Sequence, residues 1–147
     1  MRMLLLGNSY TAALHLPEKL AAALSAEVVA HTRGGARLAE QLNEKTKLGS
    51  RTQKALKEEK WDYVILQEMS KGPVIYPERY LESVAKLSKQ IKENGALLAD
   101  VGTVFFQAKE NLYAQDGSHP NALGVEKIVE VLAQTIRQDG IKNVNSK

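Results

Sequence analysis

Apolar residues along this chain occur in two patterns, as short continuous runs and as longer stretches with helical spacing. Continuous runs such as 3–6 and 63–66 are typical of strands that are buried on both faces of a parallel sheet. Apolar residues three and four positions apart, as in 77–94, predict amphipathic helices. In chain order we expect strand 3–6, helix 17–24, strand 27–31, a helix from Ala36, helix 45–60, strand 63–66, helix 77–94, a strand from 96 toward Val101, and helix 121–138.

This alternation of four strands with helices predicts an α/β fold in which helices cover both faces of a mainly parallel sheet. Such a three-layer α/β/α sandwich is flavodoxin-like in class. Residues 102–116 are irregular and are expected to form a capping loop around the apolar patch 104–106. A chain of 147 residues suits one hydrophobic core. We therefore expect a single domain over 1–142 and a flexible tail over 143–147.

Composition narrows the range of functions. The 20 basic and 17 acidic residues leave a charge of only +3, which does not indicate nucleic acid binding. The absence of cysteine excludes disulfides, thiolate metal sites and cysteine nucleophiles. No apolar run is long enough for a signal sequence or a membrane span, so no membrane partner is expected. As given, the chain is expected in the cytoplasm, with secretion of a longer precursor left open.

Polar or small residues follow three of the expected strands at the point where each strand ends. Ser9 comes after the first strand, Gly34 and Gly35 after the second, and Gln67 after the third. Ligands of open parallel sheets bind at the carboxyl ends of the strands. We therefore expect these residues to meet at one crevice.

Asp116 and His119 lie just before the last expected helix, on a loop that can reach the same edge of the sheet. A serine hydroxyl is a weak nucleophile unless an imidazole accepts its proton and a carboxylate orients that imidazole. Ser9 is thus the candidate nucleophile, His119 the candidate base and Asp116 its partner. The backbone N–H of Ser9, an N–H of the glycine pair and the side-chain amide of Gln67 are candidate donors to an oxyanion.

Each of these elements also has a purely structural interpretation. The turn 7–9 is typical of an Asx turn, and 116–119 is typical of a loop that caps a helix. The glycine pair lacks the glycine pattern of nucleotide sites, and His15 and His31 lack a ligand cluster at metal-binding spacing. We therefore expect no metal and no cofactor. A non-catalytic flavodoxin-like binding protein is the alternative to an enzyme.

The blocks that carry these residues resemble those of the SGNH hydrolases, also called GDSL-type esterases and lipases. Gly-Asn-Ser-Tyr-Thr at 7–11 is similar to the nucleophile block of one branch of that family. Gly34 and Gly35 are similar to its glycine block, with Gly35 slightly preferred as the donor, and 116–120 is similar to its Asp-x-x-His block. The resemblance covers nearly the whole chain and implies that the serine, histidine and aspartate of these blocks form a catalytic triad.

Two departures from the family pattern are visible. Gln67 replaces the usual asparagine of the third block, as in some carbohydrate-ester branches, and Glu68 beside it is a candidate structural carboxylate. The family's sheet commonly has five strands, so four or five are expected here, with one β–α unit missing near Gly95. The third strand must then pair directly with the last, or a second chain must fill the gap by strand swapping or as a homodimer. A sheet shortened in this way could also separate His119 from Ser9.

The resemblance implies a metal-independent serine esterase that acts on small-molecule acyl esters through an acyl-enzyme on Ser9. Acetyl groups on carbohydrates are one candidate substrate class. No residue identifies the acyl or the alcohol part of the substrate. The alternative is a catalytically silent protein that keeps the SGNH motifs and binds a small ligand or a carbohydrate.

Overall fold

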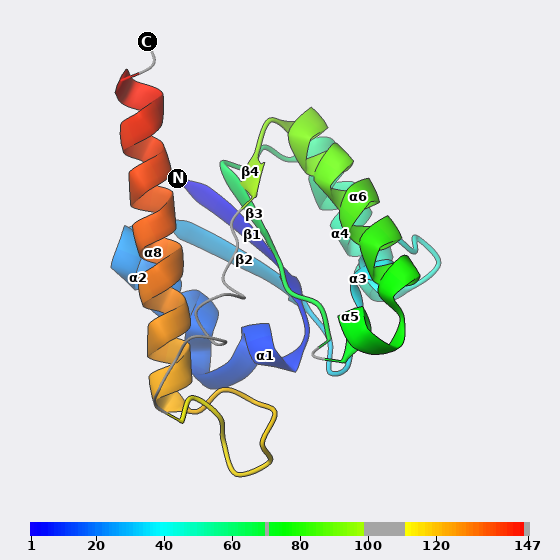
Figure 1. Cartoon of the computed structure of the whole chain (residues 1–147). Helices are drawn as coiled ribbons and strands as arrows, with labels where there is room; N and C mark the ends of the chain where they lie inside the picture. The colour runs from blue at the N-terminus through cyan, green and yellow to red at the C-terminus, as the bar shows by residue number, and fades with distance from the viewer. Residues whose placement is uncertain (70, 99–110, 146–147) are drawn as a thin grey trace.

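The computed structural model describes residues 1–69, 71–98 and 111–145, with only the backbone described for 98 and 140–145. Its centre is a parallel sheet with strand order β2-β1-β3-β4 (Figure 1). The strands are β1 (Arg2–Gly7), β2 (Glu27–Thr32), β3 (Tyr63–Leu66) and β4 (Leu97–Leu98). Gly7 lies opposite Thr32, and Leu6 lies opposite Leu66. The carboxyl ends of the first three strands are therefore level at one edge.

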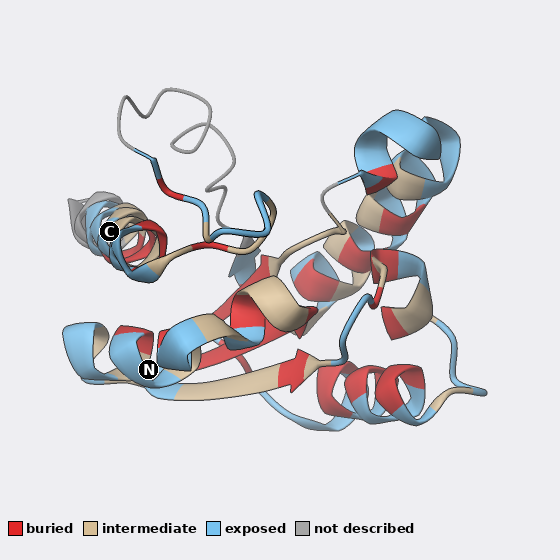
Figure 2. Ribbon diagram, turned by 90° about the horizontal axis from the view of Figure 1, so that it is seen from below, coloured by how far each residue is buried: buried red, intermediate tan, exposed pale blue. Residues whose placement is uncertain are grey.

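Alternate residues of β1 face two separate helical layers. Met3 and Leu5 are fully buried in one apolar cluster, and Leu4 and Leu6 are fully buried in the other. The first cluster includes residues of α2 and α8, and the second includes residues of α3, α4 and α6. These helices span Leu16–Leu24, Ala122–Asn145, Leu38–Gln41, Lys47–Glu58 and Pro77–Asn94, in that order. Figure 2 shows buried residues in the strands and on the inner sides of the helices. The predicted three-layer α/β/α sandwich is confirmed.

The fourth strand, β4, follows α6 directly and pairs with β3, with Tyr63 opposite Leu97. Of the two arrangements expected for a sheet that lacks a β–α unit, the described chain has direct pairing of the third strand with the last. A second chain is not needed to supply this pairing, and the homodimer stays a prediction. The continuation of β4 toward Val101 and the apolar patch 104–106 lie outside the described residues.

Two helices begin later than the sequence pattern predicts. The helix expected from Ala36 begins at Leu38, because Arg37 is extended with φ −106° and ψ 157°. The next helix begins after Thr46, whose hydroxyl oxygen accepts a hydrogen bond from the Gly49 N–H at 3.0 Å. This N-cap satisfies one of the N–H groups that a helix start leaves without an intrahelical partner.

Helix α8 continues past Gln138 to Asn145, into the segment 143–147 that is expected to be a tail. No proline interrupts this stretch, and extending a helix is easier than starting one. Three short helices were not predicted: α1 (Ser9–Ala12), η1 (Ala13–His15) and α5 (Gly72–Ile75). Elements this short cannot display apolar periodicity. Among the described helices, none is long and apolar enough to cross a membrane.

Candidate active site

A sharp turn after β1 places Ser9 at the first position of α1. Asn8 caps this helix, and its side-chain oxygen accepts a hydrogen bond from the Tyr10 N–H at 3.1 Å. Only glycine fits at position 7, because a Cβ there would lie 2.2 Å from Thr11 Oγ1 and 2.7 Å from Gln67 Oε1. The turn is therefore built so that β1 can end directly beneath the serine.

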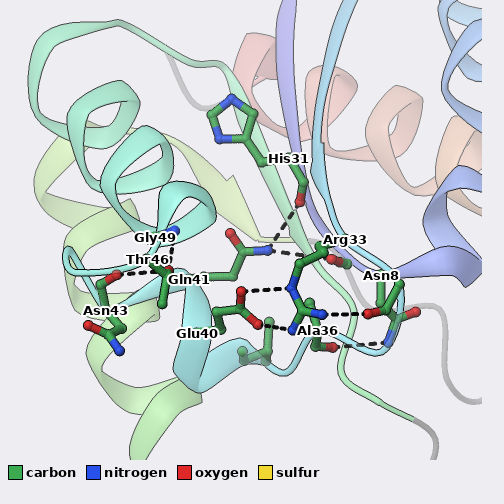
Figure 3. A network of polar contacts seen from close by, with 12 residues as sticks. Asn8, His31, Arg33, Ala36, Glu40, Gln41, Asn43, Thr46 and Gly49 are labelled. Carbon is green, nitrogen blue, oxygen red and sulfur yellow. Dashed lines mark hydrogen bonds and ion pairs between the residues drawn. The ribbon is translucent and has the colours of Figure 1, made fainter.

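Asn8 also joins the ends of three strands. Its side chain is buried and donates from Nδ2 to the Ala36 carbonyl oxygen at 3.1 Å, beyond β2 (Figure 3). Its backbone N–H donates to Gln67 Oε1 at 3.0 Å, just beyond β3. The structure thus brings together the strand ends that carry Ser9, the glycine turn and Gln67, as the parallel-sheet argument predicts.

His119 reaches the same edge from the loop before α8. Its Nε2 lies 2.9 Å from Ser9 Oγ, and its Nδ1 lies 2.5 Å from Asp116 Oδ2. A carboxylate can only accept, so Nδ1 carries the proton and Nε2 presents a lone pair to the serine hydroxyl. The shortened sheet has not separated the histidine from the serine.

The loop that carries these two residues is held by its own backbone. Tyr113 and Pro120 form an antiparallel bridge, and the Ala114 N–H donates to the His119 carbonyl oxygen at 2.8 Å. Gly117 sits at the tip with φ +68°, in the left-handed region that favours glycine. The three-residue spacing of aspartate and histidine therefore lies within one tight turn.

Asp116 is held in its charged form. Its Oδ1 accepts hydrogen bonds from the backbone N–H groups of Ser118 and His119, both at 2.9 Å. These two bonds, followed by the bond to the imidazole, lower the pKa of the carboxyl from 3.8 to about 2. At neutral pH the carboxylate is thus available to stabilise a protonated His119.

Tyr10 was not singled out from the sequence, although it follows Ser9 directly. Its ring stacks on the His119 imidazole, with 4.8 Å between the ring centroids and 30° between the planes. The first turn of α1 therefore contacts His119 through both its serine and its tyrosine. The only signal for this contact was adjacency to the serine.

Gln67 turns its side-chain carbonyl oxygen toward the turn that carries Ser9. Oε1 accepts from the Asn8 N–H and from Thr11 Oγ1, both at 3.0 Å, and Nε2 donates to the Glu68 carbonyl oxygen. Because a backbone N–H can only donate, the amide orientation is determined by Asn8. Nε2 carries two hydrogens. One is directed at the Glu68 carbonyl oxygen, and the other is the hydrogen that would be donated to an oxyanion. The donor role of Gln67 stays a prediction.

The glycine pair forms an exposed turn in which the Ala36 N–H donates to the Arg33 carbonyl oxygen at 3.0 Å. Gly35 has φ +67°, and a Cβ on Gly34 or Gly35 would meet no heavy atom within 4 Å. Within the described residues, neither glycine N–H donates to another group. The structure does not choose between the two as oxyanion donors.

Gln41 and Glu68 are two further side chains that support the strand ends around the site. Gln41 is fully buried and donates from Nε2 to the carbonyl oxygens of His31, at 3.1 Å, and Gly7, at 3.5 Å (Figure 3). Glu68 accepts from the backbone N–H groups of Leu38 and Met69, which agrees with the structural role proposed for it from sequence. Nothing in the helical pattern distinguishes Gln41 from an ordinary surface glutamine.

Comparison with solved structures gives matches along nearly the whole chain, whereas no family model and no curated protein matches. A protein of Slackia heliotrinireducens assigned to the SGNH hydrolases is 40% identical, covering 92% of this chain and 98% of that one, with a TM-score of 0.87. TesA shares the fold at 17% identity, with 94% and 99% covered and a TM-score of 0.60. The lipase/acylhydrolase from Enterococcus faecalis does so at 14% identity, with 95% and 97% covered and a TM-score of 0.54. Identity of 40% over almost the full length shows that this chain belongs to the SGNH hydrolase family.

Proposed function

We propose that this SGNH hydrolase is a serine esterase that cleaves small acyl esters, with Ser9 as the nucleophile, His119 as the base and Asp116 as its orienting partner. Acetyl groups on carbohydrates are the candidate substrate class that the family resemblance implies. One observation carries the proposal: the chain of contacts from Ser9 Oγ to His119 Nε2 at 2.9 Å and from His119 Nδ1 to Asp116 Oδ2 at 2.5 Å.

In acylation, Ser9 Oγ forms a bond to the ester carbonyl carbon while its proton passes to His119 Nε2. The π electrons of the carbonyl move onto its oxygen, which becomes an oxyanion. The adduct collapses when the bond to the alcohol oxygen breaks, and His119 gives its proton to that leaving oxygen. The low pKa of Asp116 keeps a negative charge beside the imidazolium during this step.

In deacylation, water gives a proton to His119 Nε2 and adds to the acyl carbonyl carbon. Ser9 Oγ then leaves and takes this proton back, so one water is consumed and one acid and one alcohol are released. Both oxyanions are proposed to accept hydrogen bonds from the backbone N–H of Ser9, from Gly34 or Gly35, and from Gln67 Nε2. Each donor of this kind contributes about 3 kcal/mol to lowering the barrier.

A silent protein that binds a small ligand or a carbohydrate is the competing hypothesis. Binding alone gives no reason for an imidazole to accept from a serine hydroxyl while a charged carboxylate orients its other nitrogen. An esterase requires both contacts. The arrangement of Ser9, His119 and Asp116 therefore favours catalysis.

The deciding experiment is hydrolysis of p-nitrophenyl acetate, combined with intact mass after exposure to a serine-directed fluorophosphonate. We expect turnover and a single adduct in the native protein, and loss of both in Ser9→Ala. Ser50→Ala is the matched control, because Ser50 is exposed on α4 and lies outside the proposed site. A folded native protein that shows neither turnover nor adduct would support the silent alternative.

A further inference from the structure

Arg37 lies between two of the strand ends that form the site. On one side of it, the Ala36 carbonyl oxygen accepts from the side chain of Asn8, the residue before the proposed nucleophile. On its other side, the Leu38 N–H donates to the carboxylate of Glu68 at 3.3 Å, just beyond β3. The backbone of Arg37 therefore lies at the edge of the sheet that carries Ser9.

The guanidinium of Arg37 contains a buried donor for which the described residues provide no acceptor. Its Nε is shielded from solvent, and within the described residues it makes no hydrogen bond. The neighbouring Arg33 is different, because its guanidinium pairs with Glu40 and donates to the Gly34 carbonyl oxygen. Of two arginines in the same loop, only the one beside the site lacks a polar partner in the described part of the chain.

Tyr76 holds the guanidinium in place. Arg37 Cζ lies 4.2 Å from the centroid of the Tyr76 ring, at the junction of α5 and α6. Stacking of this kind occupies a face of the guanidinium and leaves its in-plane N–H groups for an acceptor. The stacked guanidinium can thus bind a planar anion through its in-plane N–H groups, and the described residues provide no such anion.

Glu68 does not provide that acceptor. Its carboxylate oxygens receive the backbone N–H groups of Leu38 and Met69, and the described residues contain no ion pair between Glu68 and Arg37. A buried N–H that lacks a partner is costly, and native structures give such a group an acceptor from the protein, an ordered water, an ion or a ligand.

We propose that Arg37 binds a carboxylate or phosphate group of the substrate, so that the preferred substrates are esters with an anionic group close to the scissile bond. The planar fork of an arginine matches both anions in a bidentate manner. This inference rests on the proposed function, because it assigns a substrate class to the same site. It adds Arg37 as the residue that determines that class.

The test uses two pairs of esters that differ in charge. For an anion on the acyl side, 4-nitrophenyl hydrogen succinate is compared with its methyl ester; for an anion on the alcohol side, 4-acetoxybenzoate is compared with its methyl ester. We expect the native enzyme to prefer the anionic member of one pair in kcat/KM. In Arg37→Gln this preference should fall about tenfold or more, as expected for a lost charge-assisted hydrogen bond. Arg37→Lys should retain part of it.

Arg33→Gln is the matched control, because it removes the same charge from the same loop without touching the unpaired donor. Its anionic preference should stay within about twofold of the native value, since exposed charges are screened by salt. Equal preferences in native protein and Arg37→Gln for both pairs would overturn the proposal. An equal loss in Arg33→Gln would also overturn it, because the effect would then come from net charge.

A binding measurement separates this proposal from the esterase itself. In Ser9→Ala, the NMR resonance of the Arg37 Nε–H, identified by its absence in Arg37→Lys, is followed during titration with methyl hydrogen succinate or inorganic phosphate. A saturable shift that the Arg33 resonance does not share supports the anion site even if no ester is cleaved. If esters are cleaved through Ser9 but neither the preference nor the resonance depends on Arg37, only the anion proposal fails. Arg37 caps no helix through its side chain, so both variants are expected to fold.

Discussion

The turn 7–9, which carries Ser9, and the loop that carries His119 are held in different ways. Around Ser9 the supporting polar side chains are buried, with Asn8 1% exposed and Gln41 fully enclosed. On the other side of the site, the side chains of His119 and Asp116 are 41% and 49% exposed. Hydrogen bonds within that loop and the stack on Tyr10 keep them in position.

This difference predicts that catalytic activity and stability depend on different residues. Polar groups buried among strand ends contribute to the folded state, because removing one leaves its partner without water or a replacement. Exposed groups on a surface loop can be removed at small cost, since water takes their place. Substitutions of the buried side chains around Ser9, such as Asn8 and Gln41, should therefore affect folding and activity together. Substitutions at His119 should affect activity alone.

The largest expected effect is on turnover. His119→Ala and Ser9→Ala should each lower kcat roughly 10⁴-fold or more, because each removes a member of the proposed triad. The free energy of unfolding should change by no more than about 0.5 kcal/mol, since neither side chain is fully buried. Esterase assays and urea unfolding of the same preparations provide both values. Cooperative loss of structure in His119→Ala would mean that its loop belongs to the stable core.

Acid should affect the two regions over different pH ranges. Burial, with the charge of Arg51 adding to it and that of Glu59 opposing it, lowers the pKa of His31 from 6.5 to about 4. The unfolded chain therefore binds the proton first, and stability that is complete above pH 6.5 is lost as the pH falls toward 4, by about 3 kcal/mol.

The carboxylate of Asp116 behaves differently. Its lowered pKa stabilises the fold above pH 3.8, and that contribution is lost only as the pH falls from 3.8 toward 2. Urea unfolding at pH 7.5, 5.5 and 4 in native protein and His31→Asn tests the contrast. The free energy of unfolding should decline much less between pH 7.5 and 4 in His31→Asn than in native protein. An unchanged decline would mean that groups other than His31 cause it.

Gln67 is expected to contribute to both turnover and stability. Gln67→Ala should lower kcat about a hundredfold with little change in KM, as expected for a donor that acts mainly in the transition state. It should also destabilise the fold, because the Asn8 N–H loses its acceptor. Gln67→Glu keeps an acceptor for the Asn8 N–H but removes the amide donor, including its bond to the Glu68 carbonyl oxygen, so it should lose activity although the Asn8 bond is retained. If Gln67→Ala keeps the native kcat, Gln67 is not an oxyanion donor.

The smallest contrast compares two asparagines that cap helices. Asn8→Ala removes a buried cap and the bond to the Ala36 carbonyl oxygen, so we expect a loss of about 2 kcal/mol in the free energy of unfolding. Asn121→Ala removes the bond from the Gly124 N–H at 2.8 Å and the bonds from Nδ2 to the Asn111 and Tyr113 carbonyl oxygens. This site is closer to solvent, where water can replace the lost bonds, so the change should cost about 1 kcal/mol. Equal losses in the two variants, measured by urea unfolding, would remove the proposed difference between the two regions.

Much of the architecture was predictable from local patterns. The run 3–6 is apolar at every position, and only a strand between two helical layers buries all four of its side chains. The helix 77–94 was predicted to the residue, because its apolar stripe is long and Gly95 ends it with φ +89°. Gly72–Ile75 escaped prediction because four residues make barely one helical turn, too few for an apolar stripe to repeat.

Within the site, residues that are close along the chain were the easier ones to place. Asp116 and His119 are three residues apart, and one turn is enough to bring their side chains together. Gln41 was missed because its role depends on carbonyl oxygens at the ends of β1 and β2, which only the register of the sheet brings within its reach. The orientation of the Gln67 amide was missed for the same reason.

The sequence by itself determined the order of strands and helices along the chain, the parallel edge that carries Ser9, the turn of Gly34 and Gly35, and Gln67, and the turn that joins aspartate to histidine. These follow from side-chain period and short-range geometry, which the neighbouring residues specify. Only the tertiary structure decided that His119 approaches Ser9 across 110 positions of the chain. It also decided that the Arg37 Nε finds no hydrogen-bond partner among the described residues, because contacts between distant segments depend on how the layers pack and not on any local pattern.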